Sequence, residues 1–139
     1  MRETLDLLRR YYDAFNAGDT ATFLNLLTDD VAHDVNEGQR EIGREAFARF
    51  MDRMNASYRE RITNLAFMSS EDGSRGGTEY VVEGTYLETD AGLPEANGQT
   101  YRLPGGAFFE IREGKIARVT NYYNLPEWIR QVTVGSESA

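Results

Sequence analysis

The chain contains no cysteine, which excludes disulfide bonds, a thiolate nucleophile and cysteine-bound metals. His33 is its one histidine, so convergent imidazole ligands are excluded too, and we predict no metal and no cofactor. Lys115 is the single lysine among 15 basic residues, which removes most routes to a Schiff base. No apolar run is long enough to cross a bilayer and no signal peptide is evident, so we predict a cytoplasmic location.

Positive charge is also in short supply. The 23 acidic residues outnumber the 15 basic ones and give a formal net charge of -8. Binding to nucleic acid or to an anionic membrane surface needs a basic face, so we predict neither as a partner. Glycine-rich nucleotide loops and the serine-nucleophile elbow are absent as well. The remaining class of partner is a small molecule. It can be neutral or apolar at least as readily as charged, because the electric field inside a pocket does not follow the net charge of the protein.

The length and composition are those of one folded domain. The 139 residues suffice for a single core, and a hydrophobic content of 40% with 12% aromatics argues against disorder. We predict one domain over residues 1–135 and a disordered tail over residues 136–139.

Three helices are predicted in the first half of the chain. Apolar residues recur at helical spacing from Thr4 to Ala17, and Gly18 follows where a left-handed cap would end the helix. Asp19 is placed to cap a shorter helix whose buried side includes Leu27. The third helix carries a wide apolar stripe, which consists of Phe47, Phe50, Met51, Met54 and Tyr58.

Strand-like alternation dominates the second half. One short strand is predicted at 31–36, and four long ones follow at 61–69, 78–88, 100–112 and 115–124. Gly105 and Gly106 predict a bulge or a sharp bend in the third long strand. Pro126 suits the first turn of a short final helix with Trp128 and Ile129 on its apolar side. The fold class is therefore α+β, with helices packed on one face of an antiparallel sheet.

Four segments, YYDAFNAGD, DDVAHD, GREAFARF and GKIARVTNYYN, give the chain a family resemblance. Together with the long strands, they resemble the NTF2-like superfamily, and within it the ketosteroid-isomerase-related and SnoaL-like proteins. The resemblance implies a cone of three N-terminal helices on a strongly curved antiparallel sheet, with a short C-terminal helix, a deep hydrophobic pocket and commonly a homodimer. It leaves the activity open, because isomerases, cyclases, epoxide hydrolases, dehydratases and domains without known catalysis share this fold.

The resemblance also implies site residues. Ketosteroid isomerases place a tyrosine eight residues before the aspartate of the AGD turn, which corresponds to Tyr11. They place the base aspartate nine residues before the glycine that opens the third helix, which corresponds to Asp34. Counted forward from Asp30 the chain is one residue short, and such a slip would exchange Asp34 with His33 or Val35.

A third group of those isomerases is missing. They use a protonated aspartic acid on the penultimate strand to donate a hydrogen bond to the developing oxyanion. Ala107 stands near that position here, and Glu110 lies farther along on the opposite strand face. True ketosteroid isomerisation is therefore disfavoured, while another enolisation or a cyclisation remains open.

Asp34, Tyr11 and His33 are the predicted catalytic residues. A carboxylate held at an apolar pocket is suited to proton transfer, although a solvated Asp34 stays open. Tyr11 would donate to a carbonyl or enolate oxygen, and His33 is either a titrating group or a structural ring.

The predicted substrate-binding residues are Asn121 and Tyr123, which share a face of the last strand, and Phe50 and Met54 of the third helix. Tyr122 would then face outward, where a subunit interface could cover it, and Glu79 or Glu83 would lie at the pocket mouth or in solvent.

Two functions follow from the sequence, and a third is weaker. The first is a cofactor-free isomerase or cyclase that moves a proton on a small apolar carbonyl compound. The alternative is a non-catalytic binding protein for a small hydrophobic ligand, and the weaker reading is a dimerisation domain whose pocket is filled by aromatic side chains.

Overall fold

The structure is a computed structural model that describes residues 1–36 and 38–138, with side chains described up to residue 133. Its four helices are α1 (Arg2–Ala17), α2 (Thr20–Asn25), α3 (Arg44–Ser57) and α4 (Leu125–Ser138). Its six strands are β1 (Leu27–Asp34), β2 (Arg40–Ile42), β3 (Tyr58–Ser69), β4 (Arg75–Tyr86), β5 (Thr100–Arg112) and β6 (Lys115–Tyr123). Residues 37 and 139 lie outside the description, and the domain over 1–135 with its tail at 136–139 stays a prediction.

Helix α1 ends, and helix α2 begins, where the sequence predicts. Gly18 adopts the left-handed conformation with φ of 70°, and its amide donates to the carbonyl oxygens of Ala14 and Phe15. Asp19 caps α2 by accepting a hydrogen bond from the Thr22 amide at 3.1 Å. The short connection between the caps therefore folds α2 back toward α1.

Two boundaries differ from the prediction. Leu27, assigned by apolar spacing to the second helix, belongs to β1, because it pairs with Ile116 of β6 and both side chains are fully buried. Tyr58, assigned to the stripe of the third helix, is extended and starts β3 opposite Tyr86. In both places strand pairing overrides a helical spacing that a short segment cannot specify. The three-residue β2 has no counterpart in the prediction.

The strands form one curved sheet in the order β2-β1-β6-β5-β4-β3. Neighbours are antiparallel except β1 and β6, which run parallel. The register through Gly105 and Gly106 of β5 continues without a shift against both neighbours, so the bulge predicted there is wrong. The irregularity in β3 lies between Thr63 and Ala66, next to Asn64 with φ of 52°.

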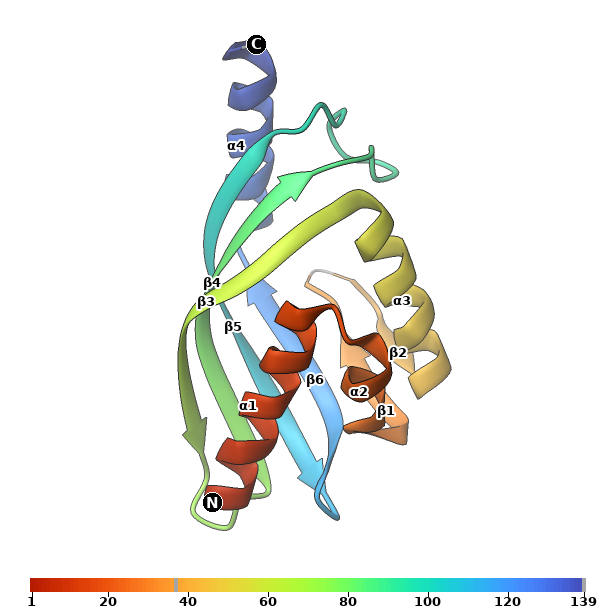
Figure 1. The fold of residues 1–139 in the computed structure, drawn as a ribbon, viewed down its shortest axis with the longest axis vertical. Coiled ribbons are helices and arrows are strands. Elements are labelled where there is room, and N and C mark those ends of the chain that lie inside the picture. Colours follow the sequence, from red (N-terminus) through yellow and green to blue (C-terminus); the bar gives the residue numbers. More distant parts are fainter. Residues whose placement is uncertain (37, 139) are drawn as a thin grey trace.

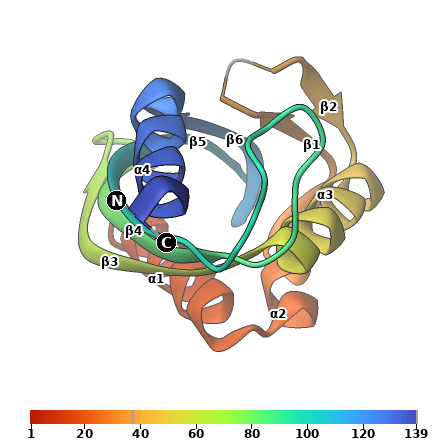
Figure 2. The same ribbon diagram turned by 90° about the horizontal axis from the view of Figure 1, so that it is seen from above.

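The curvature gives the sheet two unlike faces. Helices α1, α2 and α3 lie along its inner side, and α4 lies with the β4–β5 loop at the end opposite the N-terminus (Figure 1). Figure 2 shows the sheet curling around the inner side when the molecule is seen from that end. One apolar cluster joins α1, α2 and α3 to the sheet, and a second gathers Tyr58, Tyr86, Tyr101 and Leu103 around Trp128 of α4.

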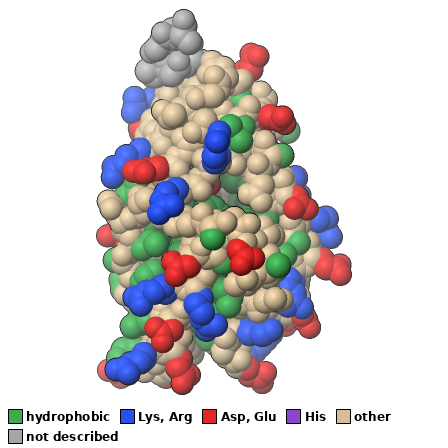
Figure 3. All heavy atoms as spheres, in the orientation of Figure 1, with side chains coloured by type: hydrophobic (Ala, Val, Ile, Leu, Met, Phe, Trp, Pro, Cys, Tyr) green, Lys and Arg blue, Asp and Glu red, His purple; other side chains and the backbone are tan. Residues whose placement is uncertain are grey.

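The outer face carries polar and exposed aromatic residues. Tyr122 is 58% exposed there, as predicted, and its ring centroid lies 5.9 Å from that of Phe108. The homodimer that would cover such a surface stays a prediction. Acidic and basic side chains are interspersed over the view in Figure 3, where no histidine is visible. None of the helices described is both long and apolar enough to span a membrane, and the cytoplasmic location stays a prediction.

Candidate functional site

A cavity of about 820 Å³ lies between the inner face of the sheet and the helices. Most of the side chains around it are aromatic or aliphatic, contributed by every helix and by strands β1, β3, β4, β5 and β6. Such a hollow with a few inward polar groups is the usual form of a small-molecule site. The residues that line it therefore decide which chemistry is available.

Asp34 does not face this cavity, and the position predicted for it is wrong. It pairs with Thr120 of β6, whose side chain lies on the outer face, and the Thr120 hydroxyl donates to Asp34 Oδ2 at 2.5 Å. Arg40 of β2 binds both carboxylate oxygens, at 2.6 and 2.9 Å. These contacts lower the pKa of Asp34 to about 2, with the Arg40 hydrogen bonds as the largest cause. A carboxylate held so firmly ionised in an ion pair is a poor proton-transfer base.

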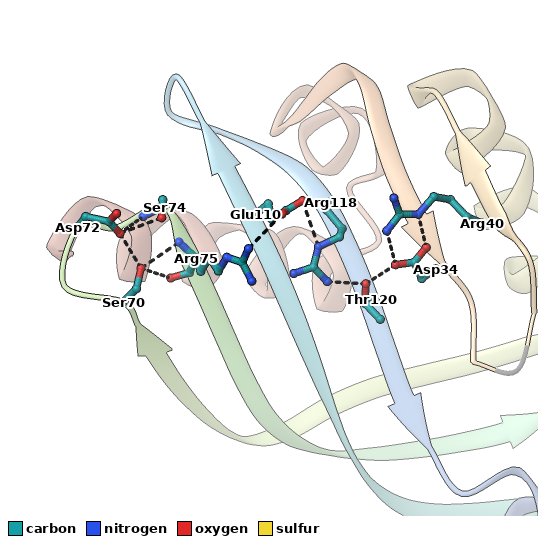
Figure 4. Close-up of polar contacts among 9 residues, drawn as sticks. All are labelled: Asp34, Arg40, Ser70, Asp72, Ser74, Arg75, Glu110, Arg118 and Thr120. Carbon is teal, nitrogen blue, oxygen red and sulfur yellow. Dashed lines mark hydrogen bonds and ion pairs between the residues drawn. The ribbon is translucent and has the colours of Figure 1, made fainter.

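The Arg40–Asp34 ion pair is one end of a polar chain across the outer face (Figure 4). Arg118 donates to the Thr120 hydroxyl at 2.6 Å and pairs with Glu110 at 3.2 Å, and Arg75 lies 3.8 Å from the other Glu110 oxygen. The predicted outward direction of Glu110 is thereby confirmed. Glu83 also faces outward, where it pairs with Arg102 at 3.3 Å.

His33 faces the cavity instead. It pairs with Val119, whose side chain is fully buried, and is itself 2% exposed. The imidazole stacks on Phe47 with ring centroids 4.0 Å apart and meets the ring of Phe50 edge-on at 4.6 Å. Burial lowers the pKa of His33 to about 4, against a smaller opposite effect of Asp34. The register of β1 against β6 thus decides between the two residues that the sequence left open, and places His33 rather than Asp34 at the cavity. With this lowered pKa, the imidazole is neutral at pH 7.

The predicted tyrosine of the first helix lies at the cavity wall. Tyr11 is 6% exposed, with its ring centroid 4.5 Å from that of Phe23 and 5.4 Å from that of Phe109. Burial raises its pKa well above the ordinary value, so the phenol stays protonated and can donate a hydrogen bond. Tyr12, next to it, also lines the cavity, and its burial raises its pKa likewise.

All four predicted substrate-binding residues line the cavity as well. Asn121 and Tyr123 project inward from β6, and Phe50 and Met54 approach from α3. Their part in binding stays a prediction, but the structure brings them together with His33 and Tyr11 around one volume.

Sequence reasoning missed Glu60, one of two carboxyl side chains among the residues that line the cavity. The other, Asp90, accepts a hydrogen bond from the Tyr58 hydroxyl at 2.7 Å. Burial raises its pKa, and a hydrogen bond from the Tyr101 hydroxyl to Oε2 at 2.6 Å acts in the opposite direction. The signal lay in the segment YRERI, where Glu60 alternates with exposed arginines and shares a face with Tyr58 and Ile62. The sequence prediction extends the preceding helix too far and starts this strand at residue 61, so the alternation from Tyr58 to Ile62 goes unrecognised.

Gly84 makes the contact between Glu60 and Tyr101 possible. The three residues form one row across the sheet, since Glu60 pairs with Gly84 and Gly84 pairs with Tyr101. Tyr101 leans over the middle strand to reach Glu60, and a Cβ on Gly84 would lie 2.4 Å from its ring and hydroxyl. A side chain at this position therefore cannot coexist with the observed hydrogen bond.

A second row repeats the arrangement. Tyr80 pairs with Gly105, a Cβ on Gly105 would lie 2.7 Å from the Tyr80 ring, and the Tyr80 hydroxyl donates to Asn121 Oδ1 at 3.2 Å on the next strand. The glycine that suggested a bulge instead admits a tyrosine across the sheet. Two tyrosines thus carry hydroxyls over neighbouring strands and build a polar band on the inner face.

A model of the SnoaL-like domain matches residues 8–119. The chain belongs to the SnoaL-like family. Its SnoaL-like fold is shared closely with solved structures described as a "putative polyketide cyclase". One, from Pseudomonas putida, is 56% identical, with 93% of this chain and 97% of that chain covered and a TM-score of 0.92. Another, from Xanthomonas campestris, is 58% identical over 94% and 97% of the chains, also with a TM-score of 0.92.

A more distant structure shares the fold alone. An NTF2-like protein of unknown function from Burkholderia pseudomallei has 19% identity, a TM-score of 0.81 and coverage of 96% and 99%. The predicted NTF2-like, SnoaL-like α+β fold is thus confirmed. The comparison with curated proteins gave no match.

The SnoaL-like cavity has no inward acid at Ala107. This residue is fully buried between Thr78 and Asn121 in neighbouring strands. Over the described part of the chain, no cluster of three or more histidine, aspartate or glutamate side chains could hold a metal ion. The polar side chains that line the cavity include the carboxyls of Glu60 and Asp90, the neutral imidazole of His33, several phenols and the amide of Asn121.

Proposed function

We propose that this SnoaL-like protein moves a proton on a small, largely apolar carbonyl compound, as a cyclase or an isomerase. The observation that carries the proposal is the carboxyl of Glu60, held at the wall of an aromatic cavity with its pKa raised by burial. A raised pKa brings a carboxylate closer to the working pH and makes it a stronger base. The cyclase description of the similar crystal structures agrees with this reaction class.

Glu60 would take the proton from a carbon next to the carbonyl. Tyr101 fixes Oε2 by its hydrogen bond, which leaves Oε1 to approach the substrate. The electrons of the broken C–H bond move into the enolate, and Glu60 becomes the neutral acid. In an isomerisation that proton returns to another carbon. In a cyclisation the enolate carbon bonds to a second carbonyl carbon of the same substrate, whose oxygen receives the proton.

The phenols around the cavity would stabilise the negative charge that develops on the carbonyl oxygen as the ketone becomes an enolate. Tyr11 and Tyr12 have pKa values raised by burial, so they stay protonated and can donate a hydrogen bond to the substrate oxygen. Donors aimed at a developing oxyanion in a water-poor site stabilise it strongly. An apolar ligand also gains by burial against the aromatic lining.

The test is deuterium exchange into β-tetralone, a neutral bicyclic ketone with acidic C–H bonds beside its carbonyl, followed by proton NMR. We expect the wild type to exceed the buffer rate and Glu60→Gln to lose about 100-fold or more of that excess, because amide cannot accept the proton. Asp34→Asn is the matched control, since its side chain lies on the outer face, and should keep wild-type exchange. Equal exchange by wild type and Glu60→Gln would dismiss the role of Glu60.

The alternative is a non-catalytic binding protein for a small hydrophobic ligand. Ala107 favours it, because the acid that donates to the oxyanion in ketosteroid isomerases is missing there. A raised melting temperature with β-tetralone and an exchange rate equal to buffer would support binding without chemistry.

A further inference from the structure

His33 contains a polar atom that the protein leaves without a partner. Its Nδ1 is enclosed and forms no hydrogen bond with any described residue. A buried polar atom in this state costs free energy, and almost all such atoms in folded proteins are paired. The surrounding rings of Phe47 and Phe50 would accommodate a phenylalanine at no such cost. An imidazole in this place therefore needs a reason outside the free protein.

The enclosure of Nδ1 selects a tautomer. A proton on Nδ1 would be a buried donor without an acceptor, so the favoured tautomer of this cavity-lining ring carries its proton on Nε2. The ring is neutral, since burial holds its pKa at about 4 and Asp34, behind it on the outer face, raises it only in part. His33 thus keeps one N–H donor, on Nε2, across a wide range of pH.

We propose that His33 binds the ligand by donating a hydrogen bond from Nε2 to the ligand's carbonyl oxygen. This inference rests on the proposed function for the nature of that oxygen, and it adds a polar anchor on β1 opposite the carboxyl on β3. Asn121 lies two residues beyond Val119, the pairing partner of His33, and on the same face. The oxygen therefore lies on the β1–β6 side of the cavity, which orients the adjacent C–H bonds toward Glu60.

The test compares two probes that differ in one oxygen, β-tetralone and tetralin, by isothermal titration with wild type, His33→Phe and His33→Gln. We expect His33→Phe to weaken the binding of β-tetralone, relative to that of tetralin, by about 3- to 10-fold, which is the effect of one neutral hydrogen bond. His33→Gln keeps an N–H donor and should restore part of the preference. Asp34→Asn, on the outer face, should leave the ratio unchanged.

Two results would overturn the inference. One is an unchanged ratio of affinities in His33→Phe, provided that urea unfolding shows the variant folded. The other is a ratio that changes around pH 6.5, the ordinary histidine value, since a neutral donor predicts a constant ratio from pH 8 down to about 5.5. Failure of the proposed function would give a different result. Deuterium exchange would survive in Glu60→Gln, while the affinity ratio of β-tetralone to tetralin would still depend on His33.

Discussion

His33 and Asp34 are neighbours on β1, yet the two faces of the sheet give them opposite chemical states. The inner face removes water from His33, so that its pKa falls to about 4 and the ring is neutral. The outer face surrounds Asp34 with Arg40 and Thr120, so that its pKa falls to about 2 and the carboxylate is ionised. The face of a strand, more than the residue type, thus decides which group can take part in chemistry.

The largest expected effect comes from placing a charge on the inner face. His33→Asp would bury a carboxylate among Phe47 and Phe50 without a cation, and an unpaired buried charge costs about 3–5 kcal/mol. Because burial raises the pKa of such a carboxyl, the protonated form is favoured and the loss shrinks as pH falls. Urea unfolding at pH 8 and pH 5 measures the loss of stability and its dependence on pH. A variant as stable as His33→Phe at pH 8 would show that water reaches this site.

A smaller effect separates two glycines of β4 that lie on opposite faces. Gly84→Ala should lower the free energy of unfolding by about 1–3 kcal/mol, because its Cβ would lie 2.4 Å from the Tyr101 ring and displace it. Gly77→Ala is the control, with its Cβ at an ordinary 3.6 Å from Phe108 on the outer face, and should change stability by less than about 0.5 kcal/mol.

The same pair also tests the inner polar row. Displacement of Tyr101 would release Glu60 from its hydrogen bond, so Gly84→Ala should reduce deuterium exchange while Gly77→Ala retains it. Equal stability and equal exchange in the two variants would contradict the tight passage of Tyr101 over β4.

The sequence predicts the scaffold well because its signals are long or local. The helical stripe of α1, the cap at Gly18 and the extended alternation of β5 each have enough residues or a conformational requirement to specify them. The site depends on details that such patterns leave open. A one-residue register on β1 exchanges His33 and Asp34, and it is set by pairing with β6 far along the chain.

Glu60 was hidden for a related reason. Tyr58 fits both the stripe of α3 and the first inward position of β3, so the apolar spacing continues the helix past its true end. The glycine rows could not be predicted either, because the sequence does not show that Gly84 and Gly105 each lie beneath a tyrosine of the neighbouring strand. Both features depend on contacts across the sheet.

The smallest effect concerns the outer ion pair. Asp34→Asn should lower the free energy of unfolding at pH 7 by about 1 kcal/mol, as for other partly exposed pairs. The pKa of Asp34 is lowered on folding, so its contribution is present above pH 4 and is lost as pH falls toward 2. Wild type and variant should therefore converge in stability on acidification. A constant difference down to pH 2 would indicate that the ionised pair is not the cause.

The most direct measurement is a carbon NMR titration of the side-chain carboxyls, with the signals assigned through Glu60→Gln and Asp34→Asn. We expect the signal lost in Glu60→Gln to titrate above the ordinary glutamate range, and the signal lost in Asp34→Asn to titrate near pH 2. A Glu60 carboxyl that titrates at or below the usual glutamate value would contradict the inner face as the site of proton transfer.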